Sequence, residues 1–400
     1  MEAGQGLQQL VGKGRSVENY PVSSPFKALK EILYDIKERN RLKGHTSAVV
    51  SARFSSDGKR ILTASRDNTA QIWDSEGNQL AVLKGHTERV NSARFSSDGK
   101  LIITASQDNT ARIWDSSGNQ LAVLKGHTDS ANSAIFSSGG KLIITASQDK
   151  TARIWDSSGN QLAVLKGHTD SVNRARFSSD GKLILTASQD KTARIWDSSG
   201  NQLAVLKGHT ERVVSARFST DGKRILTASY DGTARVWDIS GRELAVFKGH
   251  TSGVISAIFS ANGKRIITAS DDGSSRIWNI SGEELAILKG HTERIISATF
   301  SPDGKRILTA SWNKTARIWD NSGKELAVLK GHTERLVSAI FSTDGKRILT
   351  ASWDNTASVW DNSGKELAVL KGHTERVVSA RFSSDGKRIL TASWDNTARV

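Results

Sequence analysis

Histidines recur through this chain at a constant interval, and imidazole is the side chain best suited to acid–base chemistry at neutral pH and to binding transition metals. Each follows a glycine, the step is 41 residues, and the nine positions are His45, His86, His127, His168, His209, His250, His291, His332 and His373. No copy has a second histidine at a metal-ligand spacing, and the chain contains no cysteine. A nucleophile–base arrangement and a phosphate-binding glycine loop are also missing from the sequence. We therefore expect a protein that is not an enzyme, with no metal and no cofactor.

Tryptophans share the interval of the histidines, which indicates one repeated unit. They stand at Trp73, Trp114, Trp155, Trp196, Trp237, Trp278, Trp319 and Trp360. The phase never slips along the chain, so no unit carries an insertion. A period near 40 residues is typical of repeat architectures, and the β-rich signals within each unit favour small all-β units.

The second unit shows how each repeat is expected to fold. Four short strands are predicted, at residues 90–95 (VNSARF), 101–106 (LIITAS), 110–115 (TARIWD) and 120–125 (QLAVLK). Gly99, in the turn after the first strand, suits a positive φ. Strands joined by tight turns form an antiparallel meander, and one such sheet cannot bury both of its faces alone. Neighbouring units must therefore stack against one another.

The signals within each unit follow a fixed order: Gly-His, SxDG, TAS, Asp-x-Thr and Ile-Trp-Asp. This order resembles the WD40 repeat, the blade unit of β-propellers, over residues 44–400. The near-identity of the copies is similar to that of bacterial, especially cyanobacterial, WD40 arrays. The resemblance implies an all-β propeller of four-stranded antiparallel blades. Arrays of this kind often lie C-terminal to a signalling NTPase or a protease-like module.

The strand count favours a closed ring of nine blades, while rings of seven or eight blades with leftover units stay open as alternatives. Nine copies of the first three strands are present, but only eight fourth strands lie between them. In WD40 folds the outermost strand of the last blade usually comes from the other end of the chain, and residues 38–43 (ERNRLK) can supply it. The ninth unit stops at Val400, before its tryptophan. We therefore expect a fragment of a longer array.

The segment that precedes the repeats has a different character. Residues 1–24 are mainly glycine and polar residues, and they are predicted to be flexible. Ser24-Pro25 is a helix start. The apolar residues that follow fall on one face at helical spacing, at Phe26, Leu29, Ile32, Leu33 and Ile36. We predict a short amphipathic helix over 25–37 and the propeller over 38–400.

The resemblance further implies a buried hydrogen-bond network in each blade, which joins the imidazole, a serine or threonine, an aspartate and the tryptophan. In unit two these residues are His86, Ser106, Asp108 and Trp114. In the next three units the corresponding residues include His127, Asp149, Trp155, His168, Asp190, Trp196, His209, Asp231 and Trp237. Buried indole and imidazole groups need partners, so a satisfied network fixes the register of the blade. Asn313 replaces the aspartate in unit seven, and this unit is predicted to be a weak point.

Two positions vary among these near-identical units, and both are expected near the rim of the central channel, on the face of the Gly-His loops. The first precedes the network aspartate and reads Arg66, Gln107, Gln148, Gln189, Tyr230, Asp271, Trp312, Trp353 and Trp394. The second lies early in the first strand and reads Val50, Asn91, Asn132, Asn173, Val214, Ile255, Ile296, Val337 and Val378. Asparagine accompanies glutamine in units two to four, and isoleucine or valine accompanies tryptophan in units seven to nine. One arc of the rim is therefore expected to be amide-rich, and another to present three exposed indoles.

Three adjacent exposed indoles favour a docking site, because large apolar patches mark contact sites and tryptophan is frequent among binding hot spots. The alternative is that tryptophan was copied passively with the repeat and packs on Ile296, Val337 and Val378. We interpret the rim as a surface for protein or peptide partners, in an interaction scaffold or sensor array. The sequence identifies no small-molecule substrate.

The formal net charge of +15 raises a second hypothesis, binding of anions or nucleic acid. Basic pairs occupy the turn after the first strand in six units, at Lys59-Arg60, Lys223-Arg224, Lys264-Arg265, Lys305-Arg306, Lys346-Arg347 and Lys387-Arg388. Such turns are more often a solvated surface, and the aromatic residues expected of a single-strand binder lie on the other face. We therefore do not expect nucleic acid as the partner.

A third hypothesis is a structural or sensor role within a larger signalling NTPase or protease. The chain has no run of apolar residues long enough to span a membrane and no signal segment. Without cysteines it also has no disulfides. We expect a cytoplasmic location.

Overall fold

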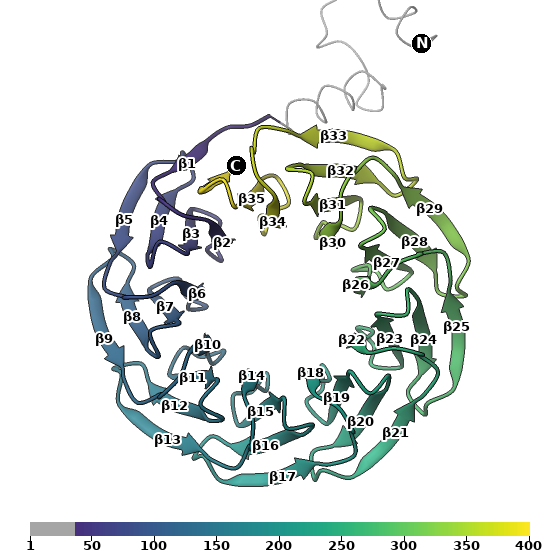
Figure 1. Ribbon diagram of the computed structural model, residues 1–400, viewed down its shortest axis with the longest axis horizontal. Coiled ribbons are helices and arrows are strands. Elements are labelled where there is room, and N and C mark those ends of the chain that lie inside the picture. Colours follow the sequence, from purple (N-terminus) through teal and green to yellow (C-terminus); the bar gives the residue numbers. More distant parts are fainter. Residues whose placement is uncertain (1–36) are drawn as a thin grey trace, which may run out of the picture. The chain divides into compact units, whose positions relative to one another are not determined.

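The structure is a computed structural model that describes residues 37–400. The chain divides into two units, Met1–Glu38 and Arg39–Val400, and the fold is that of the second. The flexible segment expected over 1–24 and, apart from Lys37, the helix expected over 25–37 lie outside the described residues. Arg39–Val400 forms a ring of nine four-stranded antiparallel sheets around an open centre (Figure 1). The prediction of a nine-bladed propeller is confirmed.

Each blade places its first strand beside the central channel and its fourth strand at the circumference (Figure 1). The innermost strands are β2 (Val49–Phe54), β6 (Val90–Phe95), β10 (Ala131–Phe136), β14 (Val172–Phe177), β18 (Val213–Phe218), β22 (Val254–Phe259), β26 (Ile295–Phe300), β30 (Leu336–Phe341) and β34 (Val377–Phe382). The second strands are β3 (Arg60–Ser65), β7 (Leu101–Ser106), β11 (Leu142–Ser147), β15 (Leu183–Ser188), β19 (Arg224–Ser229), β23 (Arg265–Ser270), β27 (Arg306–Ser311), β31 (Arg347–Ser352) and β35 (Ile389–Ser393).

The outer half of each blade has the same regularity. The third strands are β4 (Ala70–Asp74), β8 (Ala111–Asp115), β12 (Ala152–Asp156), β16 (Ala193–Asp197), β20 (Ala234–Asp238), β24 (Ser275–Asn279), β28 (Ala316–Asp320), β32 (Ala357–Asp361) and β36 (Thr397–Arg399). The outermost strands are β5 (Gln79–Leu83), β9 (Gln120–Leu124), β13 (Gln161–Leu165), β17 (Gln202–Leu206), β21 (Glu243–Phe247), β25 (Glu284–Leu288), β29 (Glu325–Leu329), β33 (Glu366–Leu370) and β1 (Arg41–Lys43).

Burial explains why each sequence segment takes its place in the blade. In β7 every residue after Leu101 is buried, as expected for a β-branched strand covered on both faces. In β9 only Leu124 is buried, and the two residues at the start of the strand are exposed, as suits an edge. Gly99 has a φ of 69° in the turn between β6 and β7, a conformation that glycine adopts without steric cost.

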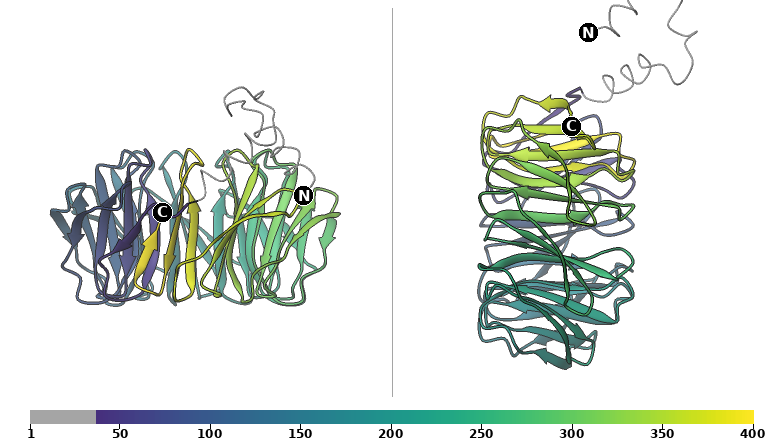
Figure 2. Two further views of the ribbon diagram at one scale, coloured as in Figure 1. Left: turned by 90° about the horizontal axis from the view of Figure 1, so that it is seen from above. Right: turned by 90° about the vertical axis from the view of Figure 1, so that its right-hand side faces the viewer.

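The hydrophobic core lies between blades rather than inside any one of them. The cluster between the first two blades joins Leu62, Ile72 and Leu83 of one blade to Ile102 and Trp114 of the next. The same arrangement recurs around the ring, so each blade completes the core of its neighbour. Loops consequently gather on two opposite faces of the ring, because the strands run through its thickness (Figure 2).

Strand β1 closes the ring by completing the ninth blade, whose order is β1-β36-β35-β34. Leu42 of β1 pairs with Ala398 of β36 and is fully buried. Beyond the strands, the Val400 carbonyl accepts from the amides of Arg39 and Asn40, and the Val400 amide donates to Asn40. The sequence prediction that residues 38–43 supply the missing fourth strand is therefore confirmed.

Candidate interaction rim

A hydrogen-bond network inside each blade fixes the loops that form the rim. In the second blade the indole Nε1 of Trp114 donates to Thr104 Oγ1 over 2.9 Å, and His86 Nε2 lies 2.8 Å from the same oxygen. His86 Nδ1 lies 2.8 Å from Asp108 Oδ2, and Asp108 Oδ1 accepts from the Thr110 hydroxyl. The carboxylate makes Nδ1 the donor, so the Nε2 of a neutral imidazole accepts the Thr104 proton. The four groups thus satisfy one another in sequence.

The role expected for Ser106 is corrected by this geometry. Thr104, two residues earlier in β7, joins the tryptophan to the histidine, because its hydroxyl oxygen lies 2.9 Å from the indole nitrogen and 2.8 Å from His86 Nε2. Ser106 Oγ instead donates to the Glu88 carbonyl and accepts from the Asp108 amide. It therefore ties the Gly-His loop to the loop between the second and third strands, and both loops lie on one face.

Unit seven keeps the network with weaker partners. His291 Nδ1 lies 3.1 Å from Asn313 Oδ1, longer than the 2.7–2.8 Å of the eight histidine–aspartate pairs. Burial lowers the pKa of His291 from 6.5 to about 4, against the raising effect of the Asn313 hydrogen bond. In Asp108 the reverse holds: burial alone would raise its pKa, but hydrogen bonds from His86 and Thr110 hold it well below the usual range.

The variable rim residues are held by backbone hydrogen bonds to the loop that follows the Gly-His pair. The amide of Trp312 donates to the Arg294 carbonyl over 3.1 Å, and the amide of Trp353 donates to the Arg335 carbonyl over 2.9 Å. The amide of Trp394 likewise donates to the Arg376 carbonyl, over 3.1 Å. An arginine and a tryptophan are therefore neighbours in each of the last three units.

These pairs continue from blade to blade as an alternating stack, which we call the Arg–Trp ladder. It consists of Arg294, Trp312, Arg335, Trp353, Arg376, Trp394 and Arg66. Guanidinium carbons lie 4.4 and 4.3 Å from the Trp312 ring centre, 5.8 and 4.3 Å from that of Trp353, and 4.3 and 4.5 Å from that of Trp394. Each contact is a cation–π interaction worth about 0.5–2 kcal/mol, depending on solvent exposure. The ladder spans three blade boundaries.

Arg294, at one end of the ladder, has a carboxylate partner, whereas the other three arginines of the ladder have none among the described residues. Arg294 Nε lies 3.0 Å from Asp271 Oδ1 of the preceding blade. Within residues 37–400 no carboxylate oxygen lies within 4.0 Å of the guanidinium nitrogens of Arg335, Arg376 or Arg66. These three cations therefore keep their N–H groups available, although their faces are covered by indoles.

The three tryptophans are half-buried rather than exposed, because the guanidinium groups cover their faces. A further aromatic contact, Arg212 with Tyr230 at 4.0 Å, stands apart from the ladder in unit five. Gly253 follows it where units seven to nine have arginine, and a Cβ there would lie 2.6 Å from the Tyr230 ring. Tyr230 is thus separated from the ladder by unit six.

The opposite arc carries the amides, and they bridge neighbouring blades. Gln148 and Gln189 donate to Asn132 and Asn173 of their own units over 3.4 and 3.3 Å. Asn132 in turn donates to the Val172 carbonyl of the next blade. The two variable positions are therefore in contact in these units, and part of each amide's capacity is used within the ring.

Of the ladder's arginines only Arg66 was among the candidates drawn from the sequence; Arg294, Arg335 and Arg376 were not. The signal was present, because arginine stands three residues after the histidine in each of the three units that have tryptophan. Arginine also occupies this position in two units that lack the tryptophan, as Arg89 beside Gln107 and Arg212 beside Tyr230. The pairing of arginine with tryptophan was therefore not evident from the sequence. Only the packing of neighbouring blades shows that an arginine also faces the tryptophan of the preceding unit, and at Arg66 and Trp394 this packing occurs where the ring closes.

The basic turns on the other face are partly engaged within the protein. Arg60 donates to the Ser116 carbonyl, and Arg265 to the Asn321 carbonyl, in each case in the following unit. Arg347 and Arg388 likewise donate to the carbonyls of Gly386 and Gly58. These arginines join neighbouring blades, which leaves mainly the exposed lysines for an external anion.

Among residues 37–400 no group of three or more histidine, aspartate or glutamate side chains is placed to hold a metal ion. In the same residues no helix has the length and apolar character needed to cross a bilayer.

Comparisons with known proteins agree with the propeller fold. A family model described as the IFT122 first beta-propeller matches residues 132–400, more than half of the chain, and the WD domain, G-beta repeat, matches residues 36–74 and 77–115. An uncharacterized WD repeat-containing protein of the cyanobacterium Synechocystis sp. is 40% identical over 80 residues, which cover 20% of this chain and 7% of that protein. The matched segment is thus a small part of a much longer relative. The chain belongs to the WD40-repeat β-propeller proteins.

Proposed function

We propose that this propeller is a non-catalytic interaction module that binds protein or peptide segments on its rim, with the Arg–Trp ladder as the binding surface. Propellers of the WD40 family commonly mediate protein–protein interactions, which supports the general class. The observation that carries the specific site is the ladder itself. Three half-buried tryptophans alternate with arginines, three of which have no carboxylate partner in the described residues.

The chemistry of the ladder suits a segment that carries carboxylates beside apolar side chains. Stacking fixes the planes of Arg335 and Arg376, so each presents its N–H edge in one orientation for a bidentate contact with a carboxylate. The exposed parts of the indoles can cover apolar groups on either side. Exposed Glu334 and Glu375 precede these arginines and limit the net charge of the arc. We therefore expect recognition by local contacts rather than by long-range attraction.

Binding through the Lys-Arg turns is less well supported, because four of their arginines donate to backbone carbonyls of neighbouring blades. A role as the sensor part of a larger signalling protein is compatible with the rim proposal. In that case the ladder would bind a segment of the same assembly.

A displayed library of random peptides tests the proposal. Selection on the protein should enrich sequences in which aspartate or glutamate alternates with aromatic or aliphatic residues. The variant Trp312→Gln, Trp353→Gln, Trp394→Gln should fold normally, because the chain itself has glutamine at this position in units two to four. Isothermal titration should show affinity for the selected peptides reduced by about tenfold or more, since buried tryptophan anchors contribute at least that much.

The matched control replaces the amide arc, with Gln107→Ala, Gln148→Ala and Gln189→Ala. It removes three side chains from the same loop position in other blades, and it should leave peptide affinity unchanged. Peptides that bind the three-tryptophan variant as tightly as the original protein would refute the ladder as the site.

A further inference from the structure

The wall of the central channel carries a second set of arginines that the rim does not use. They are Arg53, Arg94, Arg174, Arg176, Arg217 and Arg381, and all of them line one cavity of about 800 Å³. They come from the innermost strands β34, β2, β6, β14 and β18, which are consecutive in the ring except for β10. Such a volume is typical of sites that enclose small molecules. The cavity is therefore both large enough and charged enough to be a site.

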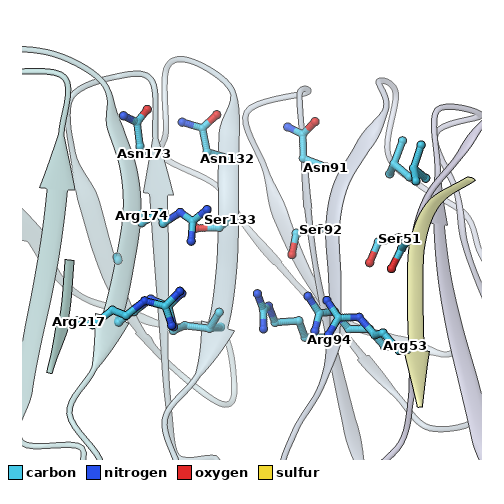
Figure 3. A pocket seen from close by; sticks show the side chains of 17 residues that line it. Ser51, Arg53, Asn91, Ser92, Arg94, Asn132, Ser133, Asn173, Arg174 and Arg217 are labelled. Atoms are coloured by element: carbon cyan, nitrogen blue, oxygen red, sulfur yellow. The ribbon is translucent and has the colours of Figure 1, made fainter. Parts of the chain in front are cut away.

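The side chains of the wall are arranged in tiers along the channel (Figure 3). Asn91, Asn132 and Asn173 form the tier nearest the rim, and the serines of the same strands, such as Ser92, lie below them. Arg53, Arg94 and Arg217 form the deepest labelled tier, and Arg174 projects at the level of the serines (Figure 3). An occupant would therefore meet amides, hydroxyls and guanidinium groups in turn, which are all hydrogen-bond donors.

No negative charge compensates the arginine tier. None of the residues that line the cavity is acidic, and within residues 37–400 no carboxylate lies within 4.0 Å of these six guanidinium groups. The Nε atoms of Arg53, Arg94 and Arg217 are buried and have no hydrogen-bond partner among the described residues. A buried donor gains free energy when it finds an acceptor, so these groups would stabilise an anion placed among them.

Burial and the charges of neighbouring arginines both lower the pKa of two of these groups. Burial, followed by the charges of Arg94 and Arg381, lowers the pKa of Arg53 from 12.5 to about 9. Burial, followed by Arg217, Arg174 and Arg94, lowers that of Arg176 to about 10. Arg53 and Arg176 remain positively charged at neutral pH. The guanidinium groups are thus close enough to repel one another, and an anion between them would relieve that repulsion.

We propose that the central channel binds a small molecule carrying several phosphate groups, held by the six guanidinium groups. Guanidinium forks fit phosphate oxygens bidentately, and several phosphates on one molecule match several arginines on one wall. The site and the rim ladder use different residues: the channel arginines lie within the innermost strands, whereas the ladder residues lie in loops. Phosphates on a linear chain, a nucleotide and a cyclitol share this chemistry.

The repeat itself supplies substitutions that respect the fold. At the position of Arg94, Arg176 and Arg217, other units have Ile135, Ile258 and Ile340. At the position of Arg174, every other unit has serine, as in Ser51. The variant Arg94→Ile, Arg176→Ile, Arg217→Ile and the variant Arg174→Ser therefore place residues that the same strand already tolerates. The first also removes repulsion, so it should fold.

Isothermal titration in magnesium-free buffer at physiological salt tests the site with inorganic tripolyphosphate, ATP and inositol hexakisphosphate as probes. We expect saturable binding of at least one probe at one site per chain. The three-isoleucine variant should lose about tenfold or more in affinity, since hydrogen bonds between charged groups are each worth about a factor of ten. Arg174→Ser should weaken binding by a smaller factor. The probe bound most tightly identifies which source of phosphate the channel prefers.

A charge-matched control separates a built site from the general attraction of a basic protein. Lys100→Gln, Lys141→Gln and Lys182→Gln remove the same three positive charges from exposed turns outside the channel. Affinity should stay within about twofold of the original, because exposed charges are screened by salt. An equal loss in both variants, no binding of any probe, or binding only of single-stranded oligonucleotides would overturn the proposal. The three-tryptophan rim variant should bind phosphate normally, so the rim and channel proposals can fail independently.

Discussion

The indole of Trp114 and the hydroxyl of Thr104 form a buried hydrogen bond of 2.9 Å, and His86 shares the same oxygen. Both side chains lie in the interior of the blade, where water cannot replace a lost partner. The hydroxyl thus satisfies an indole and an imidazole at once. Its repetition in all nine blades, with the indole present in eight, makes it the main polar contact of the core.

Replacement of Thr104 by valine should destabilise the protein by about 1–3 kcal/mol, because the indole N–H and the imidazole both lose their partner in the interior. Valine matches the shape of threonine, so packing is kept. Thr104→Ser retains the hydroxyl and is the matched control; it should cost less than Thr104→Val. Urea unfolding followed by tryptophan fluorescence measures both. A loss in Thr104→Ser as large as or larger than that in Thr104→Val would contradict a dominant contribution of the hydroxyl.

Ring closure depends on a three-residue strand, and Leu42 is its buried contact with the ninth blade. Leu42→Ala should cost about 2–5 kcal/mol, as for other fully buried leucines. Arg41→Ala changes an exposed residue in the same strand and should stay within about 0.5 kcal/mol. Limited proteolysis should cut the Leu42→Ala variant between the first and ninth blades faster than the original. Identical stability of the two variants would mean that β1 contributes little to closure.

Three lysines occupy a backbone conformation that favours other residues. Lys150, Lys191 and Lys314 each have a φ of 70°. Asparagine tolerates this region better, and at Asn68 in the same position the side chain also donates to the Thr87 carbonyl of the next unit. We expect each lysine-to-asparagine change to stabilise the protein by about 0.5 kcal/mol, with additive effects because the sites are far apart. Thermal unfolding of single and combined variants measures this.

The control for these changes is Lys141→Asn, which removes an exposed lysine from a turn position outside the positive-φ set. This variant loses the same positive charge but does not change a residue with positive φ, so its unfolding temperature should not rise. Stabilisation of the same size in this variant would assign the effect to net charge instead.

Much of the fold could be predicted from the sequence because each 41-residue repeat corresponds to one set of four strands, and so to one blade. The unpaired segment around Leu42 even revealed how the ring closes. The network was nearly predicted, but Thr104 and Ser106 are two residues apart and share a face of β7, so the sequence pattern does not say which hydroxyl reaches the indole. Ser106 ends the strand, and its hydroxyl donates to the Glu88 carbonyl instead.

The two arginine sets could not be predicted for a different reason. Arg335 contacts a tryptophan of the preceding unit, and Arg94 faces arginines of other blades, so neither contact exists within one repeat. In β6 Arg94 is half-buried, as are Asn91 and Ser92, so in the sequence it resembles an ordinary surface side chain. Arg94 lines the cavity only because the ring places β6 beside the central channel.

Asn313→Asp should strengthen the one blade whose histidine lacks a carboxylate. In the other eight units the aspartate also accepts the amide of the residue after the histidine, as Thr87 shows, whereas Thr292 has no such bond in the described structure. Restoring the carboxylate should therefore raise the free energy of unfolding at pH 7.5 by about 1–2 kcal/mol. Asn279→Asp makes the same chemical change in an exposed turn beside Glu283 and should be neutral or slightly destabilising.

The same substitution should change how stability depends on pH. The pKa of His291 is about 4 in the folded protein because of its burial, against 6.5 for a free histidine, so the unfolded chain binds the extra proton first as the pH falls. Stability is therefore lost between about pH 6.5 and pH 4, by at most about 3 kcal/mol for the full shift. With aspartate at position 313 the imidazolium gains a counter-charge, and the loss in this window should shrink. Denaturant titrations at pH 7.5, 6, 5 and 4.5 should show the stability of the two proteins diverging as the pH falls. Curves that run parallel or converge would mean that the Asn313 amide already supports the charged imidazole, and they would contradict the assignment.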